Sequence, residues 1–462
     1  MMLSRKSFLV SLAATGVAFR RSLAATSGSP IVKFGVMSDS HVTDDPKTAE
    51  PLRRMFRHMS EEGVDAVLHA GDICEVGMLA ELKHVKAAWD EAFPGGRNAA
   101  GRKTVPFFVF GNHDYLSASY MRDKLVTDEG RKTAILYNKD KAWRMLSGRP
   151  FPGEIFSMEI NGIVFVGAHW GHEAEIGEWL KAHPAGAEKP IFYIQHPHPL
   201  GTCFGDWAGG VGGNVNMLLG HPNLFSFSGH SHNTVSDDRA LWQGGFVSMG
   251  VGSARLVSIG RRKGCENAIM PPLPTGMFRH MPKASVGCAW QASIVALYSD
   301  RIEVTRRDYR YGESIGETWR IDFPFRHNSA APYLLADSAR APQFPEGAGV
   351  IVEERVGMRQ PDMAEERQIT VKMPAARGDG PYARVFYYRV EVLDADGVVL
   401  KESKVVQEDV AFAERRTLRT QGWCTFAVDE LPRGRPLRFR VYPQNTSGRE
   451  GRPITSKPVT LE

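Results

Sequence analysis

The chain has 462 residues, a length that favours two domains because one hydrophobic core rarely organises so many. Its 42% hydrophobic and 24% charged residues argue against disordered, collagen-like or coiled-coil architectures. Four of the five net positive charges come from basic residues before residue 25. The small net charge of the rest of the chain argues against the broad basic surface of a nucleic-acid-binding protein.

The first 25 residues have the composition of an export leader. Arg5 and Lys6 precede a short apolar run, and small residues follow at Ser22–Ala25. The segment Ser4–Leu9 also resembles the twin-arginine export signal, with lysine in the second basic position. We therefore expect residues 1–25 to be a signal peptide and the protein to be periplasmic or extracellular. No later apolar run approaches the roughly 20 residues that span a bilayer, so the mature chain should lack a transmembrane segment.

Residues 29–325 are predicted to form an α/β domain, because short apolar runs alternate with amphipathic stretches. Two of these stretches, Pro51–Met59 and Leu79–Trp89, repeat apolar residues at helical spacing. The apolar runs are rich in β-branched and aromatic residues, which predicts buried strands. The predicted strands are Ile31–Met37, Ala66–Leu68, Val105–Phe110, Ile163–Val166, Ile191–Ile194 and Leu224–Phe227.

The C-terminal part of the sequence predicts a second, all-β domain. A proline-bearing stretch from Pro324 to about Pro345 is typical of a linker. Residues 333–462 then show alternating strands only, with a hairpin turn signal at Asp394–Gly397. Leu431–Gly434 and Asn445–Gly448 resemble the end of a fibronectin type III domain. We therefore expect residues 333–462 to form a fibronectin type III-like β-sandwich.

Five predicted strands of the first domain each end in histidine, aspartate or asparagine. In an open α/β sheet, these carboxyl ends face one crevice where ligands bind. Imidazole, carboxylate and amide donors together suit divalent ions such as manganese, iron or zinc. Seven such ligands are too many for one four-coordinate ion and suit two ions that share a carboxylate. The strand-end blocks are Asp39-Ser40-His41, Gly71-Asp72, Gly111-Asn112-His113-Asp114, Gln195-His196 and Gly229-His230-Ser231-His232.

The spacing within the blocks agrees with a shared site. Asp39 and His41 are two residues apart, as are His230 and His232, and in an extended chain such pairs point to the same side. Glycine at the strand ends allows tight turns and a close approach of the backbone.

The five blocks, in this order, resemble the calcineurin-like metallophosphoesterases, whose pattern is D-x-H, G-D, G-N-H-D/E, a lone His after a strand, and G-H-x-H. The resemblance implies an α/β fold of four layers, in which two mixed β-sheets are flanked by helices. It also implies two divalent transition-metal ions. One would be held by Asp39, His41 and His232, the second by Asn112, His196 and His230, and Asp72 would bridge both.

This resemblance implies a phosphoester hydrolase, either a phosphodiesterase or a phosphatase. A metal-bound hydroxide would attack the phosphoryl group. By resemblance, His113 would protonate the leaving oxygen and Asp114 would orient that imidazole. Residues Ile73–Glu75 differ from the Asp-Arg-Gly that follows this aspartate in protein Ser/Thr phosphatases, and Glu75 replaces the metal-binding tyrosine of purple acid phosphatases. Both subfamilies are therefore disfavoured.

Other residues carry weaker predictions. His198 is an alternative to His196 as a ligand, and His172 is a candidate substrate contact. Phe204 and Trp207 are further candidates, because they lie in a glycine-rich loop between two site blocks. The expected substrate is a small-molecule, glycan-linked or lipid-linked phosphoester.

Two other functions remain open at this point. The chain could be an exported binding protein with a vestigial catalytic domain, but none of the expected ligands is missing. It could be a nuclease of the same superfamily, but its net charge is small. The site blocks contain no Arg or Lys, whereas a monoester specialist needs such donors for a doubly charged phosphoryl group. We therefore expect activity on diesters at least as strong as on monoesters.

Overall fold

The computed structural model describes residues 28–115, 132–183, 189–203, 215–255, 257, 290–335, 340–358, 364–378, 385–406 and 421–462. The predicted signal peptide, Phe204 and Trp207 lie outside these residues. No helix within the described ranges is long and apolar enough to cross a membrane.

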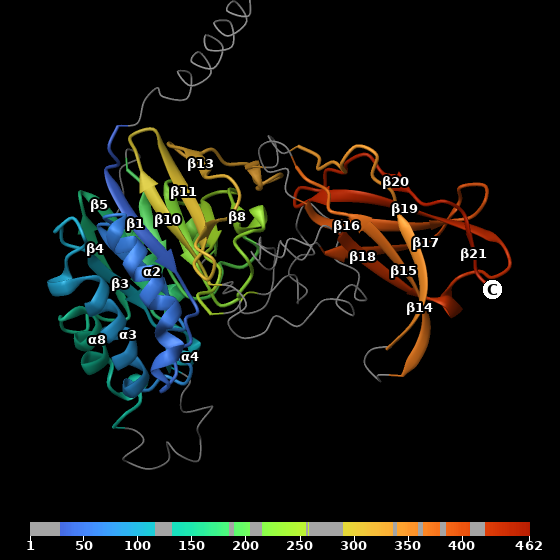
Figure 1. Ribbon diagram of the computed structural model, residues 1–462. Helices are drawn as coiled ribbons and strands as arrows, with labels where there is room; N and C mark the ends of the chain where they lie inside the picture. The colour runs from blue at the N-terminus through green and yellow to red at the C-terminus, as the bar shows by residue number, and fades with distance from the viewer. Residues whose placement is uncertain are drawn as a thin grey trace, which may run out of the picture.

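Two mixed β-sheets form the first domain (Figure 1). One has the strand order β12-β11-β10-β1-β2-β3, with β13 paired to β11, and the other has the order β4-β5-β6-β7-β9-β8. Strands β1 to β3 run parallel in the first sheet, and β5, β6, β7 and β9 run parallel in the second. The strands are β1 (Val32–Met37), β2 (Ala66–Ala70), β3 (Val105–Val109), β4 (Ile155–Ile160), β5 (Ile163–Ala168), β6 (Ile191–Ile194), β7 (Leu224–Ser228), β8 (Leu241–Trp242), β9 (Val247–Gly250), β10 (Gln291–Leu297), β11 (Arg301–Asp308), β12 (Glu313–Ser314) and β13 (Trp319–Asp322).

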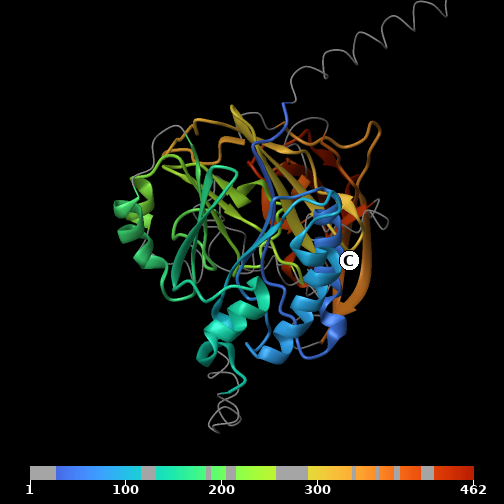
Figure 2. The same ribbon diagram turned by 90° about the vertical axis from the view of Figure 1, so that its left-hand side faces the viewer.

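Helices cover the outer faces of both sheets. Helices α2 (Glu50–Glu61), α3 (Leu79–Ala92) and α8 (Lys139–Ser147) lie side by side on the first sheet (Figures 1 and 2). Helices α9 (Ile176–Ala182) and α10 (Val215–Leu219) flank the second sheet and are the green helices of Figure 2. The predicted four-layer α/β fold is confirmed.

Helix α2 shows how local sequence builds this arrangement. Leu52, Met55, Phe56 and Met59 are fully buried, and their helical spacing places them on one face. Proline in the first turn removes a backbone N–H that has no partner there, and Glu50 in that turn complements the helix dipole.

The two sheets pack face to face through phenylalanine side chains. Phe34 of β1 is fully buried, and its ring centroid lies 5.2 Å from that of Phe165, 4.9 Å from Phe192 and 5.8 Å from Phe227. The three partners belong to β5, β6 and β7, which are three of the four parallel strands of the second sheet. One side chain of β1 thus packs one sheet against three strands of the other.

The C-terminal region contains only strands and short 3-10 turns among its described residues. Two antiparallel sheets have the orders β14-β15-β18 and β17-β16-β19-β20, with β21 paired to β19, and a separate apolar core lies between them. The predicted all-β region is confirmed, whereas its fibronectin type III character stays a prediction. The strands are β14 (Ile351–Met358), β15 (Glu365–Pro374), β16 (Val385–Leu393), β17 (Val399–Val406), β18 (Gln421–Ala427), β19 (Pro436–Asn445), β20 (Ile454–Thr455) and β21 (Val459–Thr460).

The predicted linker begins later than its sequence suggests. Phe325, Tyr333 and Leu335 are buried in the core of the first domain, and the hydroxyl of Tyr333 donates to the carbonyl of Thr202 at 3.3 Å. The proline-bearing stretch therefore continues the first domain as far as Leu335.

Phe34→Ala should destabilise the first domain by about 3–5 kcal/mol, because it removes a buried ring that contacts three strands and leaves a cavity. Denaturant unfolding followed by tryptophan fluorescence measures the loss. Phe34→Leu should cost clearly less, since it fills most of the space. A loss below about 1 kcal/mol for the alanine variant would show that the sheets do not depend on this contact.

Candidate metal centre

The seven candidate ligands and His113 gather beyond the carboxyl ends of β1, β2, β3, β6 and β7. Most of them fall into three sets, and within a set one potential ligand atom from each residue lies within 4.8 Å of the others. Five of the eight are buried, and His113, His230 and His232 are partly exposed. The three sets are Asp39, His41 and His232; His41, Asp72 and His113; and Asp72, His196 and His230.

The first set surrounds one point. The Nε2 atom of His232 lies 3.1 Å from Oδ1 of Asp39 and 3.1 Å from Nε2 of His41. Ligands at roughly 2.0–2.1 Å from one ion stand about this far apart. Asp39 is fully buried, and its carboxylate accepts the backbone N–H of His230. These three side chains can therefore hold one divalent ion.

The second set converges on His196. Its Nε2 atom lies 3.1 Å from Oδ2 of Asp72, 3.0 Å from Oδ1 of Asn112 and 3.2 Å from Nδ1 of His230. Its Nδ1–H donates to the carbonyl of Ala70 at 2.6 Å, which leaves the Nε2 lone pair for an ion. The structure thus brings Asn112 into the second set.

Asp72 lies between the two sets. Its Oδ2 atom is 3.1 Å from Nε2 of His196 and 3.8 Å from Nε2 of His41. Its Oδ1 atom accepts the backbone N–H of His113 at 2.8 Å, which fixes the orientation of the carboxylate. This is the position that a carboxylate shared by two ions would occupy.

The backbone at these residues is left-handed rather than extended. Among the described residues, six that are not glycine have positive φ, and five of them are candidate ligands. The expectation that the paired residues point to one side because the chain is extended is therefore wrong. The left-handed backbone at each turn sets the direction of the side chain. This conformation costs about 1–3 kcal/mol for each residue. The five are Asp39 (54°), His41 (44°), Asp72 (52°), His230 (66°) and His232 (55°).

The strand-end glycines are required because ligands occupy the space beside them. A Cβ atom on Gly111 would lie 2.3 Å from Oδ1 of Asp72, and one on Gly229 would lie 2.4 Å from Oδ2 of Asp39. Both distances are far below van der Waals contact. The predicted close approach of the backbone is confirmed at these positions.

The carboxylates of the site are charged at neutral pH. Burial by itself raises the pKa of Asp39, but the neighbouring His232, His196 and His41 together outweigh this effect, and the pKa falls below its ordinary value. Burial likewise raises the pKa of Asp72, and His196 and His41 together outweigh it, so the pKa is lowered to about 2. Two buried negative charges side by side make the site attractive to divalent cations.

Asp114 has a structural role that the sequence did not predict. Its carboxylate is buried and accepts the backbone N–H groups of Ile73, Cys74 and Gly111 at 2.8–3.1 Å, so it ties two site loops together. The carbonyl of Glu75 accepts the Nδ1–H of His113 at 2.7 Å and so contributes to the orientation of the ring. The role of Asp114 in orienting His113 stays a prediction.

The alternative histidines have other surroundings. The ring nitrogens of His198 lie 2.6 Å and 2.8 Å from the hydroxyls of Ser228 and Ser231, so the geometry favours His196 as the ligand. His172 lies beside Glu154 and Glu175, and its role in substrate binding stays a prediction.

The model of the family described as calcineurin-like phosphoesterase matches residues 32–234, which include every candidate ligand. This segment is similar to the calcineurin-like phosphoesterases, and we call the first domain the metallophosphoesterase domain after this similarity. No curated protein matches the chain.

Solved structures with some likeness to the chain have low similarity scores. One is a conserved Streptococcus pneumoniae protein described as a predicted phosphoesterase, with 14% identity and a TM-score of 0.27 over 63% of this chain and 97% of that one. A second is an archaeal phosphodiesterase, with 13% identity and a TM-score of 0.24 over 63% and 99%. A third is zinc-bound Vps29 from Entamoeba histolytica, with 10% identity and a TM-score of 0.28 over 63% and 99%.

Three side chains of the metallophosphoesterase domain complete the site and were not predicted. Trp170 follows β5, and its ring centroid lies 5.5 Å from that of His230. Glu75 Oε2 lies 3.3 Å from Nδ1 of His41 and 2.6 Å from a guanidinium nitrogen of Arg255. The Arg255 guanidinium also donates to the carbonyl of His41 at 2.6 Å. Glu75 and Arg255 therefore hold His41 in its orientation.

Glu75→Gln should weaken metal binding by about 10–100-fold, because a carboxylate behind a ligating histidine orients the ring and raises its basicity. Titration of the metal-stripped protein with manganese or zinc measures the affinity. Glu61→Gln, on the exposed side of α2, is the matched control and should bind as wild type does. If Glu75→Gln and Glu61→Gln bound the metal with equal affinity, Glu75 would have no role in supporting the site.

Proposed function

We propose that the metallophosphoesterase domain hydrolyses phosphoesters with two divalent transition-metal ions, whose identity is manganese, iron or zinc. The observation that carries this proposal is the position of Asp72 between two separate sets of buried ligands. Imidazole, carboxylate and amide oxygen form a donor set that fits these metals. The proposed first ion is held by Asp39, His41 and His232, the second by Asn112, His196 and His230, and Asp72 is shared.

Two bound ions would supply an activated water and offset the charge of a phosphoryl group during in-line displacement. The protein's own residues keep this site rigid. Asp39 and Asp72 each accept a backbone N–H, and His196 donates to Ala70, so the ligand atoms are fixed before an ion arrives. Such preorganisation avoids reorganisation during the reaction.

His113 is the proposed general acid. Its Nδ1–H donates to the carbonyl of Glu75, and one of its ring nitrogens lies within 4.8 Å of a potential ligand atom of His41 and of Asp72. The ring stands edge-on to that of His41, with centroids 4.5 Å apart. A proton on Nε2 would pass to the leaving oxygen, which is the step that limits esters with poor leaving groups.

The surroundings of the site support action on diesters. Arg255 reaches the ligand shell from the loop after β9, but its guanidinium is held by Glu75 and the His41 carbonyl. The positive charge is therefore already paired with a carboxylate and is poorly placed to neutralise the second charge of a monoester. The Trp170 ring beside His230 offers a flat surface for a ring-shaped ester group.

Catalytic efficiency on bis-p-nitrophenyl phosphate should equal or exceed that on p-nitrophenyl phosphate, because the diester carries one negative charge fewer at neutral pH. The comparison uses the full chain at matched pH and metal, and a metal-chelated sample should lose both activities. A strong preference for the monoester would mean that a cationic side chain reaches the phosphoryl group, which would contradict the diesterase assignment.

His113→Ala should keep both metals and lower kcat on esters with poor leaving groups by about 100- to 10,000-fold, since the leaving oxygen then departs without a proton. The loss should be much smaller with p-nitrophenolate, which leaves without assistance. His183→Ala, at the exposed end of α9, is the control for removal of a histidine. Loss of bound metal in the His113 variant would place this residue among the ligands instead.

A further inference from the structure

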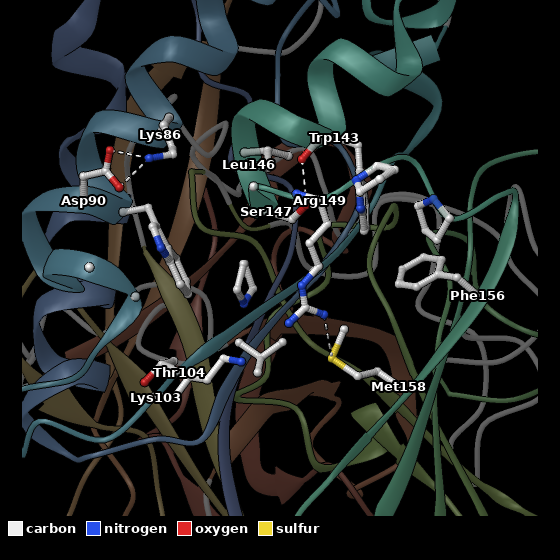
Figure 3. Close-up of a pocket in the computed structure, with 18 of the residues that line it drawn as sticks. Lys86, Asp90, Lys103, Thr104, Trp143, Leu146, Ser147, Arg149, Phe156 and Met158 are labelled. Carbon is white, nitrogen blue, oxygen red and sulfur yellow. Dashed lines mark hydrogen bonds and ion pairs between the residues drawn. The ribbon is translucent and has the colours of Figure 1, made fainter.

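A cavity of about 730 Å³ lies at the other end of β3 from the metal centre (Figure 3). Its walls come from the end of α3, the turn at Pro94–Gly96, the start of β3, the end of α8, and β4. Val105 lines the cavity at the start of β3, whereas Asn112 follows the far end of that strand, roughly 20 Å away at about 3.3 Å per residue. The cavity is therefore separate from the proposed catalytic site, and its size is usual for a small-molecule site.

The lining of this cavity is strongly basic. Lys86, Arg97, Lys103 and Arg149 line it, together with a single carboxylate, Asp90. Asp90 is paired with Lys86, which leaves three cations. Within the described part of the chain, none of these three has a carboxylate partner. Their charges lie close together without a counter-charge, so an anion would lower the electrostatic energy of the cavity.

Arg97 donates to the carbonyl of Gly101 at 2.8 Å, whereas Arg149 has a weaker partner. A guanidinium nitrogen of Arg149 lies 3.7 Å from the thioether sulfur of Met158, which is a poor acceptor. Figure 3 shows the nitrogen ends of Lys103 and Arg149 directed into the cavity from opposite sides. Two cationic donors facing one space can bind one anionic group between them through charge-assisted hydrogen bonds.

The remaining wall is apolar and aromatic. Trp89, Trp143, Leu146 and Phe156 line the cavity, and each is at least 94% buried, so the rings are held rigidly by the core behind them. Rigid aromatic walls favour planar apolar groups. The lining of the cavity thus combines cationic side chains with buried apolar and aromatic ones.

We propose that this cavity is a second binding site, for a small organic anion that has a planar apolar body and a phosphate or sulfonate group. Lys103 and Arg149 bind the anionic group, and the aromatic wall contacts the planar body. The site does not depend on the proposed hydrolysis, because none of its lining residues belongs to the metal centre.

Isothermal titration calorimetry with 2-naphthalenesulfonate tests this site, since the probe is planar and anionic and contains no phosphoester. The full-length protein should bind one equivalent. The double variant Lys103→Ala, Arg149→Ala should lose at least about tenfold in affinity, because two charge-assisted contacts disappear. The double variant Lys181→Ala, Arg320→Ala removes the same charges from exposed positions on α9 and β13 and should bind as wild type does.

Two further measurements keep the result unambiguous. Thermal unfolding should show that both double variants are folded, and the neutral analogue 2-naphthalenemethanol should bind at least about tenfold more weakly than the sulfonate. Equal affinity of the two double variants would place the probe elsewhere and overturn the proposal. Absence of binding to wild type, or equal binding of the neutral analogue, would overturn it as well.

Discussion

The architecture depends on one buried carboxylate, that of Asp72, and on the strand ends that must meet around it. Its Oδ2 atom lies near both His41 and His196, and these histidines follow strands of different sheets. The two sheets must therefore keep a fixed position relative to each other for both sets of ligands to form. Phe34 packs against three strands of the opposite sheet and contributes to that position.

Holding the ligands in place has a conformational cost that the rest of the domain offsets. Five candidate ligands have left-handed backbone, a conformation that side chains other than glycine rarely adopt. Hydrogen bonds stabilise these turns: the amides of Asp39 and His41 donate to the carbonyls of Gly71 and Asp72 at 3.0 Å. Strain concentrated at a buried polar cluster, and supported by a large apolar core, is typical of functional sites.

The sequence predicted the α/β fold and the candidate residues because buried strands carry clear apolar runs that end in polar residues. It missed β14, an exposed edge strand without such a run, and β4, in which only two of the six residues are buried. It also missed the pairing of Glu75 with Arg255, since 180 residues separate them and no local pattern links them. The sequence could not show that the carbonyl of Glu75 contacts His113, because every residue has a backbone carbonyl. The three backbone amides that donate to Asp114 were hidden as well, because every residue except proline has an amide N–H.

The central claim is that two ions share Asp72, and metal content measures it most directly. Mass spectrometry of the metal-loaded native protein should give two ions per chain. The Asp72→Asn variant should remain folded by circular dichroism and bind fewer ions, because the replacement amide loses the negative charge that both ions need. One ion in the wild type, or two tightly bound ions in Asp72→Asn, would contradict the shared-carboxylate account.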